Sequence, residues 1–428
     1  MSTALRYDLV ARCNRCGFCQ TACPVFRATG REAGVARGRI ALLRALIEGR
    51  LEWTSELEGP LFDCLRCGAC TAHCFPAVAT ADLVADARAE YLERLGRSRL
   101  HRLLLRRLLP HPTRVRRVAR LVALGKSSGL SRAARALGML RGFGRDLARA
   151  EGIVERLPEP AYRATDWSAP LAGYGPDLRI GYFVGCGMDV LCPRAAGASV
   201  GLLRRLGRSV QVLDNCCCGL PATTYGDRQA ACDLAARNLQ RIDAEALDVV
   251  VTDCSSCASY LKHYPELFAA DNPRAEAARR LSSRVRDLLE LLPALHGDGS
   301  AGLAAAPPRR PRIVTYHDPC HAARGQQLVK EPRQALRGVP GLEYRELPEA
   351  DWCCGGAGAY ALSHFDLSLR VLDRKIDNVA RTGADLLVTA CPACVVQLSY
   401  GIRRRGLPIE VCHISQVLAD STPSTPWP

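Results

Sequence analysis

Apolar residues recur at helical spacing in the first 175 positions of the chain. One such stripe predicts a helix that ends near Gly49, and its members are Ile40, Leu42, Leu43, Leu46 and Ile47. A second set predicts two further helices, separated by Pro110 and Pro112, and consists of Leu100, Leu103, Leu104 and Leu108, then Val115, Val118 and Val122. The first part of the chain is therefore expected to be helical.

From about Leu178 the pattern changes to short, nearly continuous apolar runs that alternate with helical segments. Runs of this kind are typical of strands buried in a parallel sheet. They occupy residues 179–184, 210–213, 248–253, 312–316 and 385–390. We expect two small α/β units, joined by a linker at 298–311 that is rich in Gly, Ala and Pro. Residues 422–428 are expected to form a disordered tail.

A run of four cysteines occurs twice near the N-terminus. The first run has the spacing C-x2-C-x2-C-x3-C-P, and the second is displaced from it by 51 residues: Cys13, Cys16, Cys19 and Cys23, then Cys64, Cys67, Cys70 and Cys74. This spacing wraps three thiolates around a cubane cluster and directs the fourth toward a neighbouring cluster. Closed zinc sites usually use two separated C-x2-C pairs instead. The two runs therefore predict two [4Fe-4S] clusters.

The spacing also predicts that the two runs exchange their fourth cysteines. Cys74 should join the first three cysteines of the first run, and Cys23 should join the first three of the second run. The second run departs from the pattern at one point, because Phe75 separates Cys74 from Pro76, whereas Pro24 directly follows Cys23. The loop at Cys74 is therefore expected to differ in detail.

The two α/β units carry a tandem repeat of five cysteines each. Corresponding cysteines are 134, 136 or 137 residues apart, which indicates a duplication: Cys186, Cys217, Cys218, Cys254 and Cys257, then Cys320, Cys353, Cys354, Cys391 and Cys394. Most of them follow the predicted strands, at the sheet edge where α/β folds place their sites. The cysteines without a counterpart in the other half are interpreted as ordinary thiols: Cys192, Cys216, Cys232 and Cys412.

The adjacent cysteines in each half indicate the kind of metal centre. Neighbouring side chains of a regular strand face opposite sides, so two adjacent thiols do not readily reach one ion. They can bridge different irons of a larger cluster if the following glycine lets the loop turn. This favours an iron–sulfur cluster of unusual shape, with zinc on three or four of the thiols as the alternative. His317 and His321 flank Cys320, and among ligand, hydrogen-bond donor to a thiolate and plain strand end, the donor role is favoured for His317.

The positive charge of the chain is concentrated in one segment. The net charge is +15, and the segment from Arg94 to Arg145 contains fifteen Arg or Lys residues and no Asp or Glu. It is expected to be either the solvated face of a packed helix pair or a docking surface for anionic lipid or an acidic partner. With Phe143 as its one aromatic residue, it has no platform for stacking bases, so nucleic acid is not expected as a partner.

Composition indicates the compartment and the class of protein. The chain has 428 residues and 22 cysteines, far longer than the small secreted scaffolds that disulfides hold together. Residues 1–11 lack the apolar core of a signal peptide, and no run approaches eighteen apolar residues. A cytoplasmic protein is therefore expected, with peripheral contact on the inner face of the cell membrane left open. No dinucleotide fingerprint or hydrolytic constellation is evident, so a flavin or nicotinamide site is not expected on this chain.

The whole pattern resembles a known family. A two-cluster ferredoxin unit followed by two cysteine-rich CCG domains is similar to the iron–sulfur subunit of bacterial glycolate oxidase. It is also similar to the iron–sulfur subunits of lactate and anaerobic glycerol-3-phosphate dehydrogenases, and to the cysteine-rich subunit of heterodisulfide reductase. The most specific segments are Arg37-Gly-Arg-Ile40 and Cys353-Cys-Gly-Gly-Ala-Gly-Ala-Tyr-Ala-Leu-Ser-His364. Both look most like the glycolate oxidase subunit.

The resemblance implies a multidomain protein. Its expected parts are a two-cluster ferredoxin-like domain at 1–90, a basic helical connector at 91–175, and CCG domains at 176–298 and 309–421. It implies an electron-transfer subunit that receives electrons from a separate FAD-binding subunit oxidising glycolate or lactate, and passes them to quinone or another membrane acceptor. Glycolate oxidase subunits often lose cysteines from the C-x2-C ends of their CCG domains, whereas both ends are complete here. That completeness, shared with the heterodisulfide reductase group, allows two further noncubane [4Fe-4S] clusters and keeps a disulfide-cleaving function as the alternative.

Overall fold

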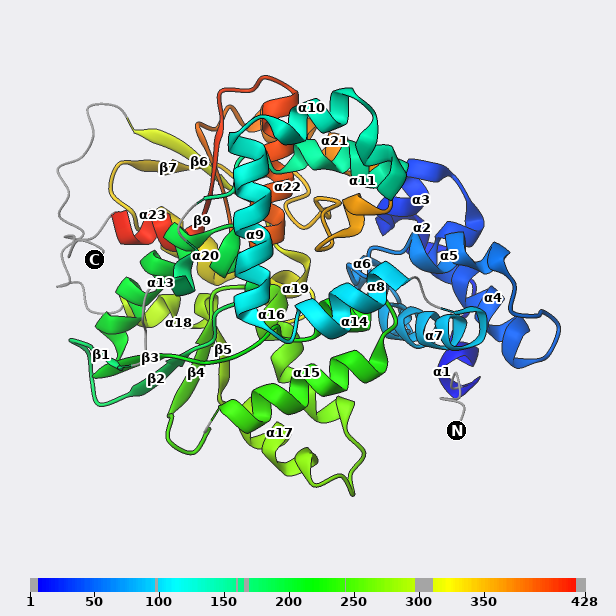
Figure 1. Ribbon diagram of the computed structural model, residues 1–428, viewed down its shortest axis with the longest axis horizontal. Helices are drawn as coiled ribbons and strands as arrows, with labels where there is room; N and C mark the ends of the chain where they lie inside the picture. The colour runs from blue at the N-terminus through cyan, green and yellow to red at the C-terminus, as the bar shows by residue number, and fades with distance from the viewer. Residues whose placement is uncertain are drawn as a thin grey trace.

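The computed structural model describes residues 7–96, 99–158, 161–164, 169–242, 244–296 and 311–420. Helices of the N-terminal part form one end of the molecule, and two sheets with their covering helices form the other (Figure 1). This confirms the expected multidomain architecture. The expected tail at 422–428, and the linker at 298–311 apart from residue 311, lie outside the described residues.

The N-terminal domain is built from short helices around a small apolar core. Its α-helices are α1 (Tyr7–Ala11), α2 (Phe18–Ala22), α3 (Pro24–Thr29), α4 (Ala36–Ile47), α5 (Glu58–Phe62), α6 (Ala69–Ala72) and α7 (Thr80–Leu95). The predicted helix before Gly49 is confirmed as α4, which buries Ile40 and Leu43 against Leu61 and Leu83. Gly49 has a φ of 69°, a left-handed conformation that stops a helix at low steric cost.

The two cysteine runs adopt the same backbone conformation. Arg15 and Arg66 occupy equivalent positions and have φ values of 55° and 52°. Gly17 and Gly68, two residues later, have φ values of 88° and 73°. Successive turns of this kind point backbone N–H groups into a concavity that favours negative charge. The repeated spacing in the sequence therefore reflects a repeated loop geometry.

The basic connector differs from the predicted helix pair. It contains α8 (Arg99–Leu103), a π-helical turn (Leu104–Leu108), α9 (Pro112–Ser127), α10 (Leu130–Ala136) and α11 (Arg145–Ala150), with 3₁₀ turns at Met139–Phe143, Glu151–Ile153 and Tyr162–Ala164. The expected break at the prolines is present, because α9 begins at Pro112. The expected apolar stripes are not packed into a core, since Leu103, Leu104, Val118 and Val122 are exposed. Periodicity alone could not show this, because it does not reveal whether a neighbouring element covers a helix face.

The first CCG domain contains a five-stranded sheet in the order β1-β3-β2-β4-β5. Its strands are β1 (Leu171–Ala172), β2 (Arg179–Tyr182), β3 (Ser209–Val212), β4 (Val249–Thr252) and β5 (Val285–Asp287). Its helices are α12 (Cys186–Val190), α13 (Pro193–Leu206), α14 (Leu220–Thr224), α15 (Arg228–Arg241), α16 (Ser255–Lys262), α17 (Arg274–Arg284) and α18 (Leu288–His296), with a 3₁₀ turn at Tyr264–Leu267. The three predicted strands are confirmed and parallel, but β1 pairs antiparallel with β3, so this sheet is not wholly parallel.

The second CCG domain contains a wholly parallel sheet in the order β7-β6-β8-β9. Its strands are β6 (Arg312–Tyr316), β7 (Leu342–Tyr344), β8 (Leu386–Thr389) and β9 (Glu410–His413). Its helices are α19 (Cys320–Ala323), α20 (Lys330–Arg337), α21 (Phe365–Thr382), α22 (Pro392–Arg404) and α23 (Ile414–Asp420), with a 3₁₀ turn at Tyr360–Leu362. The predicted strands β6 and β8 are confirmed. Strands β1, β5, β7 and β9 were not predicted, because β1, β5 and β7 have only two or three residues, and β9 has Glu410 and His413 at its ends in place of a continuous apolar run.

The two CCG domains share one hydrophobic core and pack directly against each other. Buried residues of α21 and α22 pack in one cluster with the core of the first sheet. Helix α13 of the first domain lies against α23 of the second. Ser415 Oγ donates to the Ala195 carbonyl at 2.9 Å, and His413 Nε2 lies 2.9 Å from the Asp253 carbonyl. The relative position of the two duplicated halves is therefore fixed by buried contacts.

Arg88 of α7 joins the N-terminal domain to the first CCG domain. Its side chain is 2 % exposed, and its guanidinium donates to the Leu61 carbonyl at 3.0 and 2.8 Å and to the Thr224 carbonyl at 2.6 Å. The backbones approach closely at the same place, because a Cβ on Gly226 would lie 2.7 Å from the Arg88 carbonyl carbon. The docking of the two domains thus involves a buried cation and a close backbone approach at a glycine.

Replacing Arg88 by alanine should destabilise the protein and loosen this contact. Buried carbonyls that lose their donor cost about 1–3 kcal/mol each, so we expect a loss of at least about 3 kcal/mol. The urea midpoint of unfolding and the rate of proteolysis between α7 and α14, both measured without oxygen, would report the change. Arg44→Ala, which removes the exposed ion pair between Arg44 and Glu48 on α4, is the matched control and should change little. Equal effects of the two substitutions would contradict this role of Arg88.

Candidate metal centres

The eight cysteines of the N-terminal domain line two adjoining cavities. One cavity is lined by Cys13, Cys16, Cys19 and Cys74, and the other by Cys23, Cys64 and Cys67, while Cys70 borders both. The cysteines that the spacing assigned to each cluster thus lie together, including the exchanged Cys23 and Cys74. Four thiols around each cavity are a donor set that suits an iron–sulfur cluster.

Burial keeps several of these thiols protonated until metal binds. Burial raises the pKa of Cys23 to about 11, and it raises the pKa of Cys70 still further, with the sulfurs of Cys64 and Cys67 adding to the rise. Because a thiolate is the ligand form, cluster assembly must displace these protons. Cys16 is the exposed member of the set, and the neighbouring Phe18 and Phe75 are 63 % and 92 % exposed. The first cavity therefore has one thiol at the surface.

In the first CCG domain the five predicted cysteines form a continuous set of contacts. The thiol of Cys217 makes hydrogen bonds with Cys186 and Cys218, and Cys218 in turn contacts Cys257. Cys257 also contacts Cys254, the residue that caps the N-terminus of α16. Hydrogen bonds from the neighbouring thiols lower the pKa of Cys218 to about 5, which favours a thiolate there.

The second CCG domain repeats the arrangement with one addition. Cys354 contacts Cys353 and Cys394, and its Sγ lies 3.6 Å from that of Cys394. Cys391, the N-cap of α22, contacts Cys394, and Cys320 begins α19 beside them. The pKa of Cys354 is lowered by hydrogen bonds from Cys353 and Cys394, and also by His317. The ring nitrogens of His317 and the sulfurs of Cys354 and Cys394 all lie within 4.8 Å of one another.

The sites are also in contact with one another. Cys254 and Cys391 occupy equivalent positions in the two halves, and their thiols hydrogen-bond across the domain interface. At the other side of the second CCG site, Cys353 hydrogen-bonds to Cys67 of the second N-terminal cavity and lowers the pKa of Cys67 to about 6. Arg324 Nη1 supports this junction by donating to the Cys67 carbonyl at 3.3 Å. A continuous series of sulfur contacts thus leads from the N-terminal domain through both CCG sites.

Glycine allows the adjacent cysteines to face one site. Gly219 and Gly355 directly follow the two cysteine pairs and have φ values of 100° and 82°. A Cβ on Gly355 would lie 2.6 Å from the Ser368 carbonyl oxygen. The left-handed turn, which L side chains rarely adopt, breaks the alternation of a regular strand. The structure thus agrees with the expectation that the glycine after each cysteine pair lets the loop turn.

Two buried cations near the sulfurs were not predicted from the sequence. Lys375 is fully buried in α21, and burial lowers its pKa to about 8 while the thiols of Cys353 and Cys354 oppose that shift. Its ammonium donates to the Ala350 carbonyl at 3.1 Å. Arg324 lies beside Cys67, Cys320 and Cys353, which raise its pKa. Positive charge here offsets the negative charge of clustered thiolates, but no sequence signal joins residues so far apart in the chain.

The cysteines interpreted as ordinary thiols lie outside these contacts. Cys216 hydrogen-bonds to Asn238 Oδ1 at 3.3 Å, and Cys232 to the Leu267 carbonyl at 3.5 Å. Burial raises the pKa of Cys192 to about 12 and that of Cys216 to about 11. Cys412 is buried in β9.

Comparison with known proteins agrees with this architecture. A model of the 4Fe-4S dicluster domain matches residues 9–78, a cysteine-rich domain model matches 180–262 and 314–399, and a model of the glycolate oxidase iron-sulfur subunit linker region matches 96–154. The probable glycolate oxidase iron-sulfur subunit of Bacillus subtilis (strain 168) is 32% identical over 421 residues, which cover 96% of this chain and 93% of that protein. The chain belongs to the glycolate oxidase iron–sulfur subunit family.

Two other relatives show how far the similarity extends. The glycolate oxidase iron-sulfur subunit of Escherichia coli (strain K12) is 28% identical over 405 residues, covering 92% of this chain and 91% of that protein. Lactate utilization protein A of Geobacillus thermodenitrificans (strain NG80-2) is 34% identical over 242 residues, covering 56% of this chain and 98% of that protein. The family similarity extends over the whole architecture, including the basic connector.

The exchange of cysteines between the two N-terminal clusters can be tested by comparing single substitutions. Cys23→Ala should abolish the same electron paramagnetic resonance signal as Cys64→Ala, and leave the signal that Cys13→Ala abolishes, because Cys23 lines the second cavity. Cys74→Ala should behave like Cys13→Ala. Iron content and the reduced spectra of the four variants provide the measurement, with Cys232→Ala as the control. If Cys23→Ala removed the same signal as Cys13→Ala, each run would bind its own cluster and the exchange would be wrong.

Proposed function

We propose that the chain is the iron–sulfur electron-transfer subunit of a flavin-linked 2-hydroxy-acid dehydrogenase, with glycolate as the first candidate substrate and lactate as the second. The observation that carries the proposal is the series of sulfur contacts from Cys67 to Cys186. Bound clusters would supply one-electron carriers along this series. We expect two [4Fe-4S] clusters in the N-terminal domain, and noncubane [4Fe-4S] clusters in the CCG domains, with zinc as the alternative there.

Electrons would enter at the first N-terminal cluster. Its cavity contains the exposed Cys16, and Phe18 and Phe75 are exposed on either side of the ligand positions. Exposed aromatic residues are enriched in protein interfaces, so this face suits a partner subunit. We propose that a separate FAD-binding subunit docks here, because relatives of this chain are named as iron-sulfur subunits. The flavin would take two electrons from the hydroxy acid and release them singly to this chain.

The route through the chain follows from the order of contacts. Cys70 borders both N-terminal cavities, Cys67 meets Cys353 of the second CCG site, and Cys391 meets Cys254 of the first. The far end is Cys186, which begins α12. We therefore favour transfer through both CCG domains over direct transfer from the N-terminal clusters to an acceptor.

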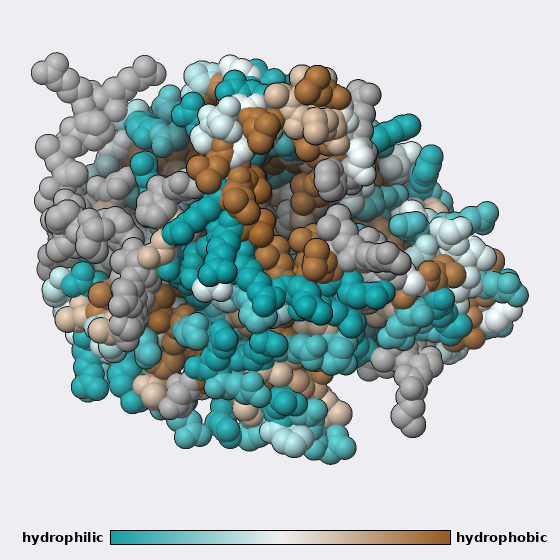
Figure 2. All heavy atoms as spheres, in the orientation of Figure 1, coloured by the Kyte–Doolittle hydropathy of each residue, from teal (hydrophilic) through white to brown (hydrophobic). Residues whose placement is uncertain are grey.

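The basic connector covers the far end of this route. Helix α9 packs against α12, and Arg116 lies 3.5 Å from Asp189 of that helix. Apolar side chains lie along α9 and toward α10 at the front of the molecule, beside hydrophilic ones (Figure 2). Leu121, Leu124 and Leu130 in this region are exposed by more than half. Apolar and basic side chains on one surface suit a membrane with anionic lipids, where a quinone would be the acceptor.

A cytoplasmic protein bound peripherally to the inner face of the cell membrane fits this arrangement. No described helix is long and apolar enough to cross a bilayer. Nucleic acid is not proposed as a partner. We assign the basic surface of the connector to anionic lipid instead.

The function can be tested by isolating the native complex without oxygen through an affinity tag on this chain. A flavoprotein should co-purify, and glycolate or D-lactate should bleach both its flavin and the cluster absorption. The preferred acid is the one with the higher kcat/KM in dye reduction. Disulfide cleavage with a reduced viologen donor, without flavin and without activity on hydroxy acids, would contradict the proposal. That result would favour a heterodisulfide-reductase-like function in which a CCG site cleaves the disulfide.

A variant of the same complex distinguishes electron transfer through both CCG domains from direct transfer out of the N-terminal clusters. Cys353→Ala removes the thiol that joins Cys67 to the second CCG site. Glycolate should still reduce the N-terminal clusters, while reduction of a short-chain quinone by membrane-bound complex should fall at least tenfold. Cys412→Ala, a buried cysteine outside the series, is the control. Unchanged quinone reduction in Cys353→Ala would show that electrons leave directly from the N-terminal clusters.

Charge reversal on the connector tests the membrane contact. Each basic residue near an anionic surface contributes about 1 kcal/mol to binding, so Arg117, Arg120 and Arg132 all changed to Glu should weaken binding at least about 100-fold. Co-sedimentation with phosphatidylserine-containing vesicles, compared with pure phosphatidylcholine vesicles, provides the measurement. The control reverses Arg274, Arg279 and Arg280 on α17, which gives the same change in net charge elsewhere. An equal loss in both triple variants, or no loss in the first, would refute a membrane surface at α9 and α10.

A further inference from the structure

The second CCG site contains a histidine where the first has phenylalanine. His317 and Phe183 both stand three residues before the first cysteine of their half, Cys320 or Cys186. Both side chains are buried, at 1 % and 0 % exposed. An apolar residue therefore satisfies the packing at this position in one half of the duplication. The imidazole in the other half needs a different explanation.

The imidazole of His317 is buried and interacts with the thiol of Cys354. Both ring nitrogens are inaccessible, and neither has a partner of good geometry among the described residues. A buried polar group left in this way costs about 1–3 kcal/mol, so it indicates a partner of another kind. His321, which directly follows Cys320, differs in this respect because its Nδ1 lies 3.1 Å from Ser256 Oγ. Burial lowers the pKa of His321 to about 4 and thus favours the neutral ring.

The ring of His317 faces two sulfurs whose separation suits one metal ion. The Sγ atoms of Cys354 and Cys394 are 3.6 Å apart. Two thiolates on one tetrahedral ion, each at about 2.3 Å, are separated by about 3.8 Å. A ring nitrogen of His317 lies within 4.8 Å of both sulfurs. Three donors from β6, the Cys-Cys-Gly turn and α22 thus converge on one point.

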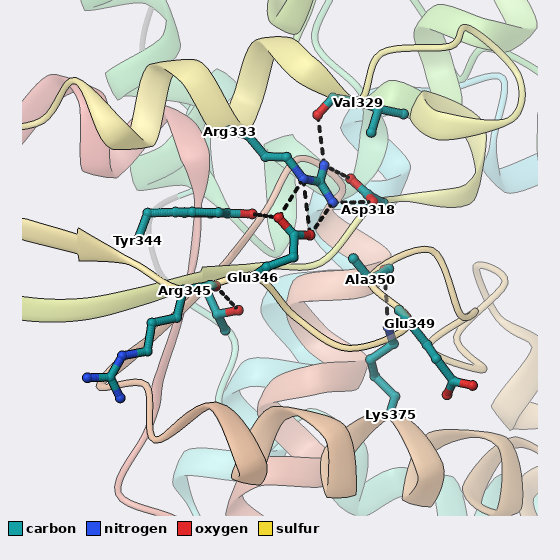
Figure 3. Close-up of polar contacts among 10 residues, drawn as sticks. Asp318, Val329, Arg333, Tyr344, Arg345, Glu346, Glu349, Ala350 and Lys375 are labelled. Atoms are coloured by element: carbon teal, nitrogen blue, oxygen red, sulfur yellow. Dashed lines mark hydrogen bonds and ion pairs between the residues drawn. The ribbon is translucent and has the colours of Figure 1, made fainter.

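The loop that carries His317 is held in place from both sides. The His317 N–H donates to the Val388 carbonyl at 2.9 Å, and the Asp318 N–H donates to the Ala350 carbonyl at 3.1 Å. Arg333 binds the Asp318 carboxylate with two hydrogen bonds of 2.9 Å (Figure 3). The same guanidinium also binds Glu346, at distances between 2.7 and 3.1 Å (Figure 3).

A buried lysine fixes the opposite loop. Lys375 donates to the Ala350 carbonyl, the same group that accepts from Asp318, and this contact is drawn in Figure 3. Cys353 and Cys354 follow three and four residues after Ala350. The histidine and the thiols are therefore fixed relative to one another by protein contacts alone, which is the preorganisation that a metal site requires.

We propose that His317 is a ligand of the second CCG site and binds, through a ring nitrogen, a metal ion that Cys354 and Cys394 also bind. The proposal rests on the proposed function in one respect, namely that this site holds iron. It replaces the donor role that the sequence favoured for His317. A neutral imidazole adds no negative charge to the cluster, whereas a thiolate adds one. Imidazole ligands in place of thiolates therefore raise the potential of iron–sulfur centres. Exchanging this neutral ligand for a thiolate should therefore lower the potential of the second CCG site.

Pulsed electron paramagnetic resonance can detect the bond directly. The full chain would be produced with ¹⁴N- or ¹⁵N-histidine, and hyperfine spectra recorded over a redox titration. A histidine nitrogen coupling is expected in the wild type and in His321→Gln, and it should be lost in His317→Phe, which copies the residue of the first half. His317→Cys should keep the iron and shift the midpoint potential of the same centre to a more negative value. Cys394→Ala identifies the signal that belongs to the second CCG site.

The outcomes separate this proposal from the proposed function. If Cys394→Ala changes neither the iron content nor any signal, the site holds no iron and the ligand role is refuted, whereas the proposed function stands, because it allows zinc in the CCG domains. If the site holds iron but the coupling is absent from the wild type, or survives in His317→Phe, then only the ligand role is refuted. Loss of the coupling in His321→Gln instead would assign the bond to His321 and would also overturn the proposal.

Discussion

Contact between buried sulfur atoms is the constraint around which this molecule is built. The series of contacts begins at Cys67 and runs through Cys353 and Cys354 to Cys391 of the second CCG site. From there it crosses to Cys254 and runs through the first CCG site to Cys186. Thiols brought this close and buried require either protons or metal to limit their mutual repulsion. The helix N-termini at Cys254 and Cys391 and the left-handed glycines after each cysteine pair place the sulfurs there.

Burying this much potential negative charge demands compensating cations inside the protein. Arg88, Lys375 and Arg324 supply it, and each also donates to backbone carbonyls of the loops that hold the cysteines. Their role is thus both electrostatic and structural, since Arg88 and Arg324 join the N-terminal domain to the CCG domains and Lys375 fixes a loop within the second CCG domain. Because the two CCG domains share one core, a movement of either sheet would disturb both groups of cysteines.

The duplication produced two sites that are similar but not equal. The five cysteines, the glycine turn and the parallel strands recur in both halves. The second half differs by His317 in place of Phe183, and by the contact of Cys353 with Cys67. Such differences in ligands and surroundings are the means by which a protein gives chemically similar centres different potentials. The two ends of the series of sites therefore differ. The N-terminal domain lies at one end, and α12, which packs against the basic helix α9, lies at the other.

The sequence by itself determined the local chemistry of this protein. Cysteine spacing grouped the thiols that line each N-terminal cavity, with Cys23 and Cys74 exchanged, because the two runs repeat one spacing and three thiols of each group lie close together in the chain. Apolar runs located β2, β3, β4, β6 and β8, because a buried strand must be apolar on both faces. Only the tertiary structure decided which sites meet, as Cys67 meets Cys353 and Cys254 meets Cys391. It also decided that the apolar face of α9 is exposed and that His317 faces Cys354 and Cys394. Contacts between residues hundreds of positions apart depend on how domains pack, and packing leaves no period or spacing in the chain.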